Sequence, residues 1–377
     1  MNTRKVLFLG AGASVPAGYP PTSSLLEKVA EEAKSSLFPQ FRNAWQSWTR
    51  YLASSPPWLR LVLKNPNPEV ALTLPDLFEL AIHEQDRSRS SQLMRRARKG
   101  KDTSQSIVRL EAYYKSEKRA TLAKARTARR RLIDALQWYF TFKLGDKGVT
   151  DRTEYLRNQL SALSTGDVVI TTNWDPLVEQ LLAQEGRWIP TDGYGFQRGM
   201  GLLSGLRRVA LPGGLGVVSE IQVLKLHGCF GWRDLDDGFF LEGNEFLSQF
   251  RFAFEGRRIQ MRDMDEPTSY RPSNPIIAFP SYLKSLIHST LFEVWRTASL
   301  VISDCSDFAA AGYSLPASDS AVRALLLPIA NGARTGRVRV TIADPAKATL
   351  DTWREFLGHN PKFLQLGLEA APVLLDG

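Results

Sequence analysis

The side chains best suited to chemistry are Asn173 and His227, each of which directly or closely follows a run of apolar residues. Asn173 offers a hydrogen-bond donor and an acceptor without charge, which suits it to hold a hydroxyl group or a carboxamide. His227 can accept a proton near neutral pH and could act as a general base. Asp175 could fix Asn173 or accept a hydrogen bond from a ligand amide. Asn and Asp are also usual residues of a turn after a strand, so this segment alone leaves both interpretations open.

A second candidate is the glycine-rich segment Gly10-Ala11-Gly12-Ala13-Ser14, which follows the apolar run 6–9. Between a strand and a helix, such a turn lets backbone amides approach a pyrophosphate closely. It lacks the third glycine of the dehydrogenase fingerprint, and no second strand ends in an acidic residue about 20 positions further on. A simple strand-to-helix turn would have the same sequence.

The apolar runs that must position these residues alternate with helical patterns. We predict helices around 25–29, 155–160 and 177–182, and in 191–216 a long loop that could contain a hairpin. This alternation is typical of an α/β fold, a Rossmann-like and mostly parallel sheet wrapped by helices, in which ligands bind at the carboxyl ends of the strands. Strands are predicted at 6–9, 167–172, 221–226, 276–279 and 337–342, and the apolar residues 300–302 precede a segment that ends in Gly312-Tyr313-Ser314-Leu315-Pro316.

Residues 37–150 differ in character and are predicted to form a large helical insertion after the first βα unit, which leaves 1–36 and 151–377 as a nucleotide-binding domain. Within the insertion, residues 87–131 contain 16 Lys or Arg and 3 Asp or Glu, which gives this segment a charge of +13 in a chain whose net charge is +9. Such a segment is either a solvated helix face or a surface for nucleic acid or an acidic protein partner. A long helical insertion could also serve assembly into a homo-oligomer.

The composition argues against several classes of protein. Hydrophobic residues make up 43% and charged residues 23% of the chain, as in ordinary soluble globular proteins. No run reaches the roughly 18 apolar residues that a membrane span requires, and the apolar stretch after the N-terminus is too short for a signal peptide. Two cysteines, Cys229 and Cys305, cannot form a four-cysteine zinc site. We therefore expect a cytoplasmic protein without a structural metal.

Taken in chain order, five segments resemble the motifs of the sirtuin family. The resemblance covers about residues 1–30 and 155–350. Gly10-Ala11-Gly12-Ala13-Ser14 with Gly18-Tyr19-Pro20 is similar to the opening glycine motif, 171–175 to the segment whose Asn and Asp contact ribose and nicotinamide, 226–228 to the segment of the active-site histidine, 312–315 to a glycine–x–serine–leucine nucleotide-binding segment, and Asp344 to a residue near adenosine.

Two departures from that family narrow the resemblance. No four-cysteine zinc ribbon follows the histidine, and Thr172 stands where deacetylases usually carry Gln. In this the chain resembles zinc-free sirtuin-like domains that consume NAD in bacterial antiphage defence, where water is the attacking group. The resemblance implies an NAD hydrolase that releases nicotinamide and ADP-ribose, with NAD as substrate and no metal.

The resemblance also implies a role for each candidate residue. Asn173 would orient the ribose and the attacking water, and His227 would accept a proton from a ribose hydroxyl. Asp175 would hold the carboxamide, with Thr172 beside it in the NAD site. Gly10, Ala11, Gly12 and Ser14 would contact the pyrophosphate, and Gly312, Ser314 and Asp344 the adenosine side.

Two other functions remain open at this point. One is a non-catalytic sensor that binds NAD or ADP-ribose without turnover, and the other is a protein deacylase, which the missing zinc ribbon disfavours. Because effectors of this kind are usually silent until triggered, the resemblance also implies a regulatory partner. A ring-forming ATPase or a guide-dependent nucleic-acid sensor would both fit.

Overall fold

The computed structural model describes residues 4–54, 104–140, 151–196, 200–204, 207–210, 219–235, 238–242, 262–263, 276–278, 289–358 and 362–375. By their contacts, the residues divide into two compact units. One unit comprises Met1–Thr22 and Gln137–Gly377, and the other comprises Ser23–Leu136.

The first unit is built on a six-stranded sheet in which every strand is parallel to its neighbours. Renumbered within the sheet, the order is 3-2-1-4-5-6, the doubly wound Rossmann order, with its switch point between β1 and β9. The predicted Rossmann-like α/β fold is therefore confirmed. From one edge to the other the strands are β5 (Gln222–Lys225), β2 (Val168–Thr171), β1 (Arg4–Leu9), β9 (Cys305–Ala311), β10 (Arg339–Ala343) and β11 (Lys362–Leu364).

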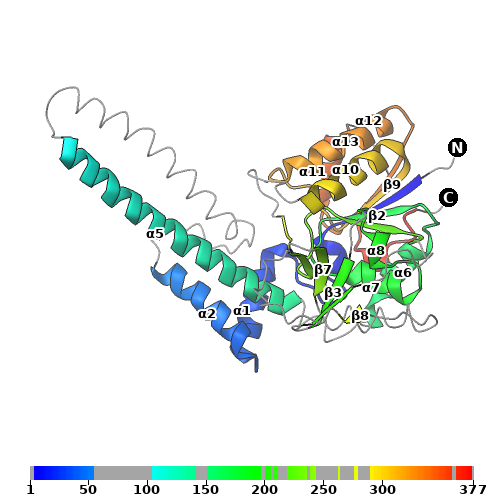
Figure 1. Ribbon diagram of the computed structural model, residues 1–377. Helices are drawn as coiled ribbons and strands as arrows, with labels where there is room; N and C mark the ends of the chain where they lie inside the picture. The colour runs from blue at the N-terminus through cyan, green and yellow to red at the C-terminus, as the bar shows by residue number, and fades with distance from the viewer. Residues whose placement is uncertain are drawn as a thin grey trace. The chain divides into compact units, whose positions relative to one another are not determined.

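The central strands are apolar because helices cover both faces of the sheet. All four residues of β2 are buried, as are the last four of β1, which is the pattern of a strand without a solvent-facing side. Figure 1 shows α10 to α13 gathered on one side of the sheet and α6 and α7 on the other, as right-handed crossovers in this strand order require. The helices are α6 (Glu154–Ser161), α7 (Leu177–Gln184), α8 (Pro190–Gly193), α10 (Ser289–Asp304), α11 (Ser320–Leu325), α12 (Leu327–Arg334) and α13 (Lys347–Leu357), and the 3-10 turns are η1 (Ala11–Ser14), η2 (Thr22–Ser24), η5 (Asp151–Thr153) and η6 (Leu368–Ala370).

A smaller second sheet follows α8 in the chain. Its strands β3 and β4 pair in antiparallel fashion and form the hairpin that the sequence allowed within 191–216. The strand order is β6-β7-β3-β4-β8, with β3 (Met200–Ser204), β4 (Arg207–Ala210), β6 (Trp232–Leu235), β7 (Gly238–Glu242) and β8 (Arg262–Asp263).

The second unit is helical in the part that the structure describes. It contains α1 (Leu25–Ser35), α2 (Pro39–Ser54) and nearly all of α5 (Ser104–Gln137). Helix α1 packs against α2 and so groups with the helical insertion rather than with the strand that precedes it. Toward the end of α5, Ala125, Ala128 and Leu132 are buried, at the spacing of one face of a helix. The first part of the basic segment, residues 87–103, lies outside the described residues.

One predicted strand is not a strand of the sheet, and one further apolar run lies in a helix. Ile277 forms only an isolated antiparallel bridge with Gly228, so 276–278 is not a strand of the sheet, and residue 279 lies outside the described residues. Leu300 to Ile302 lie within α10, where Val301 and Ile302 are buried and Leu300 is exposed. The strand itself, β9, begins at Cys305. A short apolar run fits a buried helix face as well as a strand, and here the helix continues through it.

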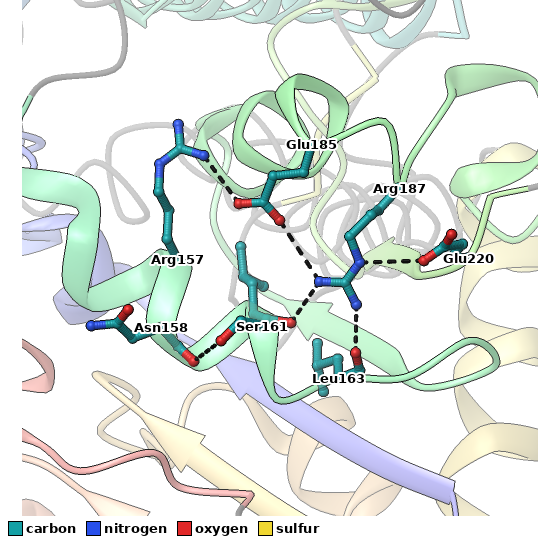
Figure 2. Close-up of polar contacts among 8 residues, drawn as sticks. Arg157, Asn158, Ser161, Leu163, Glu185, Arg187 and Glu220 are labelled. Carbon is teal, nitrogen blue, oxygen red and sulfur yellow. Dashed lines mark hydrogen bonds and ion pairs between the residues drawn. The ribbon is translucent and has the colours of Figure 1, made fainter.

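Near the amino ends of β2 and β5, Arg187 links the segments that lead into these two strands (Figure 2). Its guanidinium donates to the Leu160 carbonyl oxygen at 2.9 Å and to the Leu163 carbonyl oxygen at 2.5 Å. Its Nε lies 3.4 Å from a carboxylate oxygen of Glu220, the residue two before β5. Glu185 contacts Arg187 at 3.7 Å and Arg157 of α6 at 3.0 Å. These contacts hold the amino ends of the two strands and leave the carboxyl ends to other residues.

Within the described part of the chain, none of the helices combines the length and the apolar character that crossing a membrane would need.

Candidate functional site

The carboxyl edge of the sheet carries both Asn173 and His227. The last residue pair between β2 and β5 is Thr171 with Lys225, and Asn173 and His227 each stand two residues beyond it. Parallel neighbouring strands run in the same direction about 4.8 Å apart, so the chain leaves the sheet at adjacent points shortly before these two residues. The Leu226 N–H donates to the Thr171 carbonyl oxygen at 2.9 Å and extends the ladder by one bond.

Asn173 is anchored to the glycine-rich turn after β1. Its Nδ2 donates to the Gly10 carbonyl oxygen and to the Ser14 hydroxyl oxygen, both at 3.0 Å. Its backbone N–H donates to Thr171 Oγ1 at 3.0 Å, and that hydroxyl in turn donates to the Leu9 carbonyl oxygen at 2.9 Å. The side chain is buried, and its Oδ1 has no hydrogen-bond partner among the described residues. A buried acceptor without a partner is costly unless something else supplies a donor.

Asp175 is coupled to the same anchor, because the Ser14 side chain is one of the groups that lower its pKa. Asp175 is buried, and its Oδ1 accepts from the Leu177 N–H at 3.1 Å, where α7 begins. Burial raises the pKa of this carboxyl, while the positive charge of Lys225 opposes the rise. Asp175 thus fills the turn-forming role common after a strand and also faces the residues around Asn173.

A buried ion pair between Lys225 and Glu179 contacts the Asn173–Asp175 turn. Lys225 Nζ lies 3.0 Å from Glu179 Oε1 and donates to the Asp175 carbonyl oxygen at 2.5 Å; both ionisable side chains of the pair are at most 1% exposed. Burial by itself lowers the pKa of Lys225, but Glu179, Cys229 and Asp175 together raise it above its usual value. The ammonium group therefore stays charged. Glu179 Oε2 has no hydrogen-bond partner among the residues that the structure describes.

His227 pairs with a carboxylate from a distant loop. Its Nε2 lies 3.3 Å from Asp319 Oδ2, and the two side chains are 4% and 0% exposed. The Tyr313 hydroxyl donates to the same Oδ2 at 2.7 Å, while the tyrosine ring packs against Phe8 with a centroid distance of 5.0 Å. Because β2 and β1 separate β5 from β9 in the sheet, the loop after β9 must cross their carboxyl ends to reach His227.

The glycines near β1 and β9 allow two backbone turns to touch. The N–H groups of Gly10 and Gly12 donate to the carbonyl oxygens of Ala311 and Gly312 at 3.0 and 2.9 Å. A Cβ at Gly312, whose φ is +64°, would lie 2.2 Å from the Ala13 nitrogen, and a Cβ at Gly10 would lie 2.4 Å from the Gly312 carbonyl oxygen. These glycines thus allow the two turns of the chain to pack closely against each other. The amides of Gly10 and Gly12, which are predicted to contact pyrophosphate, already have hydrogen-bond partners in the protein.

The other predicted contact residues lie around this edge with varied exposure. Thr172 is partly exposed, and its N–H donates to the Leu9 carbonyl oxygen at 3.2 Å. Ala11 is partly exposed and Ser314 is exposed. Asp344 is buried after β10, where its Oδ1 accepts from the Ala346 N–H at 2.8 Å just before α13. Its pKa is raised by burial. Of these four, Asp344 has the clearest structural use, in the turn that leads into a helix.

Leu315 adds a constrained residue to the loop that carries Tyr313 and Asp319. Its φ of 51° is the only positive value at a described residue other than glycine, a conformation that costs a branched side chain of order 1 kcal/mol. The Arg323 side chain donates two hydrogen bonds to its carbonyl oxygen, at 3.2 and 2.8 Å. The loop is therefore held in one shape from within.

Four residues of this site are not among the candidates that the sequence patterns indicate. Tyr313 and Asp319 stand in or just after the Gly312–Leu315 motif, so proximity to a singled-out motif was a signal for them. Lys225 stands in an apolar strand, and a lysine in a buried run needs a partner charge. Its partner, Glu179, looks like an ordinary helix residue in the sequence, so only the packing of α7 on the sheet discloses it.

Among the described residues, His, Cys, Asp and Glu do not gather in any group of three or more that could hold a metal ion. Comparison of the chain with models of protein families gives no match, and comparison with curated proteins gives none either.

Proposed function

We propose that the chain is an NAD hydrolase of sirtuin-like kind, which cleaves the bond between nicotinamide and ribose and releases nicotinamide and ADP-ribose. Asn173 and His227 would carry the reaction at the carboxyl edge of a Rossmann-ordered sheet, where such folds bind nucleotides. The proposal joins the resemblance of five short segments to sirtuins with the arrangement of those segments at one sheet edge.

A single observation carries most of the weight. The Asn173 amide nitrogen is fixed by Gly10 and Ser14, while its buried Oδ1 has no partner among the described residues. A side chain whose donor is fully engaged and whose acceptor is left over is oriented for a ligand that brings a donor. A ribose hydroxyl or a water molecule is such a donor, so Asn173 fits the role proposed for it.

The chemistry asks little covalent work of the protein. Nicotinamide leaves from a positively charged pyridinium, so the transition state resembles an oxocarbenium ion, and the protein needs to hold the ribose, exclude bulk solvent and place one water. Asn173 would orient the ribose and that water. His227 would take a proton from a ribose hydroxyl, which would in turn take the proton that the attacking water loses as its oxygen bonds to the ribose carbon and nicotinamide leaves. Asp175 would contact the nicotinamide carboxamide. The exposed side of the turn at Ala11 would face the pyrophosphate, because Gly10 and Gly12 already donate to backbone carbonyls.

The experiment that tests the proposal is nicotinamide release from NAD by the purified full-length chain. Asn173→Ala and His227→Ala should each lower kcat by about 100-fold or more, because positioning and general-base catalysis each contribute on that scale. In calorimetry, the affinity of His227→Ala for NAD should lie within a few fold of that of wild type. Variants that release nicotinamide as fast as wild type would remove both assignments. NAD binding without any release, even in the presence of candidate activators, would favour the sensor function instead, and removal of the acyl group from an acyl-lysine peptide would favour a deacylase.

The biological setting is part of the same proposal. An NAD hydrolase of this kind would act as an effector of a prokaryotic antiviral defence system that depletes NAD in the cytoplasm. Unchecked hydrolysis would harm the cell that makes it, so a regulatory partner, such as a ring-forming ATPase or a nucleic-acid sensor, or assembly into a homo-oligomer, would control it. The basic segment 87–131 is the candidate surface for nucleic acid, and binding there should weaken steeply as salt rises.

A further inference from the structure

We propose that Asp319 is the positioning residue of His227: it fixes which imidazole nitrogen carries the proton and balances the positive charge that forms when the histidine accepts a second one. This inference rests on the proposed hydrolysis for its kinetic consequence, while the pairing itself can be tested without any activity.

The charge of Asp319 requires a partner in the interior of the protein. Asp319 is fully buried, and a buried carboxylate is stable only when donors or a cation compensate it. Its Oδ2 receives the Tyr313 hydroxyl at 2.7 Å and faces His227 Nε2 at 3.3 Å. Because a carboxylate accepts and does not donate, the nitrogen that faces it is the one that carries a proton. His227 is thereby set as the tautomer with hydrogen on Nε2 and its lone pair on Nδ1.

His227 gains a positive charge when it acts as a base. When a ribose hydroxyl loses its proton, that proton is taken up at Nδ1 and the imidazole becomes an imidazolium with hydrogen on both nitrogens. The adjacent carboxylate lowers the free energy of this charged form in a buried place, where the charge would otherwise be costly. This is the logic by which a buried carboxylate supports a histidine base in acyl-transfer enzymes. Asp319 does not touch the substrate, and its effect on the reaction passes through His227.

The loop that leads to Asp319 is held by contacts from two helices. Asp319 precedes α11, and its position depends on a loop that crosses the ends of β1 and β2. Arg323 of α11 holds the Leu315 carbonyl oxygen, and Trp353 Nε1 of α13 donates to the Tyr313 carbonyl oxygen at 2.9 Å. Two helices thus hold the first part of the segment from Tyr313 to Asp319, and α11 begins directly after Asp319. A loop tied in this way can place a carboxylate against an imidazole with little freedom to move away.

The test uses the full chain labelled with 15N-histidine. The chain has four histidines, so a His227→Gln variant identifies the His227 signals. Imidazole 15N shifts distinguish a protonated ring nitrogen from an unprotonated one. In wild type the His227 spectrum should show Nε2 protonated and Nδ1 not, and Asp319→Asn, which keeps the shape and removes the charge, should move both resonances. Asp304→Asn, an exposed residue at the end of α10, should leave them in place.

The kinetic arm uses the same variants with NAD. Asp319→Asn should lower kcat by about 100-fold with little change in KM, because a misplaced base slows the chemical step while the ligand contacts remain. Tyr313→Phe keeps the ring packed against Phe8 and loses only the hydroxyl, so it should lower kcat by about 10-fold. If Asp319→Asn fails to fold, Tyr313→Phe carries both measurements.

The outcomes separate the two proposals. Unchanged His227 resonances in Asp319→Asn, or an unchanged kcat in an active enzyme, would overturn the role of Asp319. If wild type releases no nicotinamide under any condition, the proposed hydrolysis falls, and the imidazole resonances alone still decide whether Asp319 sets the tautomer of His227.

Discussion

The Asn173 amide nitrogen lies 3.0 Å from the Ser14 hydroxyl oxygen, although the two residues are 159 positions apart in the chain. This hydrogen bond joins the turn after β1 to the turn after β2. One serine therefore helps to orient Asn173, the residue proposed to hold the ribose and the attacking water.

Replacing Ser14 by alanine should disturb Asn173 more than it disturbs the fold. We expect Ser14→Ala to lose about 1–2 kcal/mol of unfolding free energy, since it removes one buried hydroxyl with polar neighbours. It should also slow nicotinamide release by about 10-fold through loss of the Asn173 orientation. Chemical unfolding and the release assay measure the two effects. Ser161→Ala is the matched control, because that exposed hydroxyl bonds only to the Asn158 carbonyl oxygen of its own helix. Equal behaviour of the two variants would contradict this account.

Gly312 should tolerate no side chain, whereas another glycine of similar backbone conformation should. Gly312 and Gly336 have φ values of +64° and +71°, but only Gly312 faces backbone atoms, while the space around Gly336 is open. Gly336→Ala should cost about 1 kcal/mol of unfolding free energy from the left-handed conformation. Gly312→Ala should cost about 3 kcal/mol or more, because overpacking adds to the same strain. Urea denaturation compares the two, and similar midpoints would argue against the close approach of the two turns.

Lys225→Met should be strongly destabilising. It removes the only partner charge that Glu179 has within the described residues, for which about 3–5 kcal/mol of unfolding free energy is expected. The buried carboxyls would then hold protons more tightly in the folded than in the unfolded chain. Stability of the variant should accordingly fall as pH rises, so its deficit relative to wild type should be smaller in mild acid than at neutral pH. Adding Glu179→Leu to Lys225→Met should recover part of the loss. A deficit that is the same at every pH would contradict the charge argument.

The two thiols should make folding sensitive to alkaline pH. Burial raises the pKa of Cys229 from 9.0 to about 11 and that of Cys305 from 9.0 to about 12. The folded chain therefore keeps both protons where the unfolded chain loses them. The stabilisation is complete below pH 9 and is lost as pH rises toward 11 and 12. Between pH 9 and about pH 11, the unfolding free energy should fall less steeply in a variant with both cysteines replaced by alanine than in wild type. An identical fall in wild type and variant would show that other groups cause it.

Much of the fold follows from the local sequence. The short runs Val6–Leu9 and Val168–Thr171 are apolar at successive positions, which a strand covered on both faces requires, and helical patterns alternate with them. From this alternation the parallel sheet and its carboxyl edge could be predicted. The order of the strands could not, because order depends on which crossover packs against which face. Nor could the fate of 300–302, whose apolar residues serve a helix and not a strand.

The sequence by itself determined which residue types stand after which strands, and hence that Asn173 and His227 would leave the sheet at one edge. Only the tertiary structure decided what holds them there. Ser14, Asp319 and Glu179 reach their partners across long stretches of chain, and such contacts exist only once loops and helices have packed on the sheet. The physical reason is that a hydrogen bond or an ion pair depends on distances of a few ångströms in space, while sequence patterns report only the periodicity of neighbours along the chain.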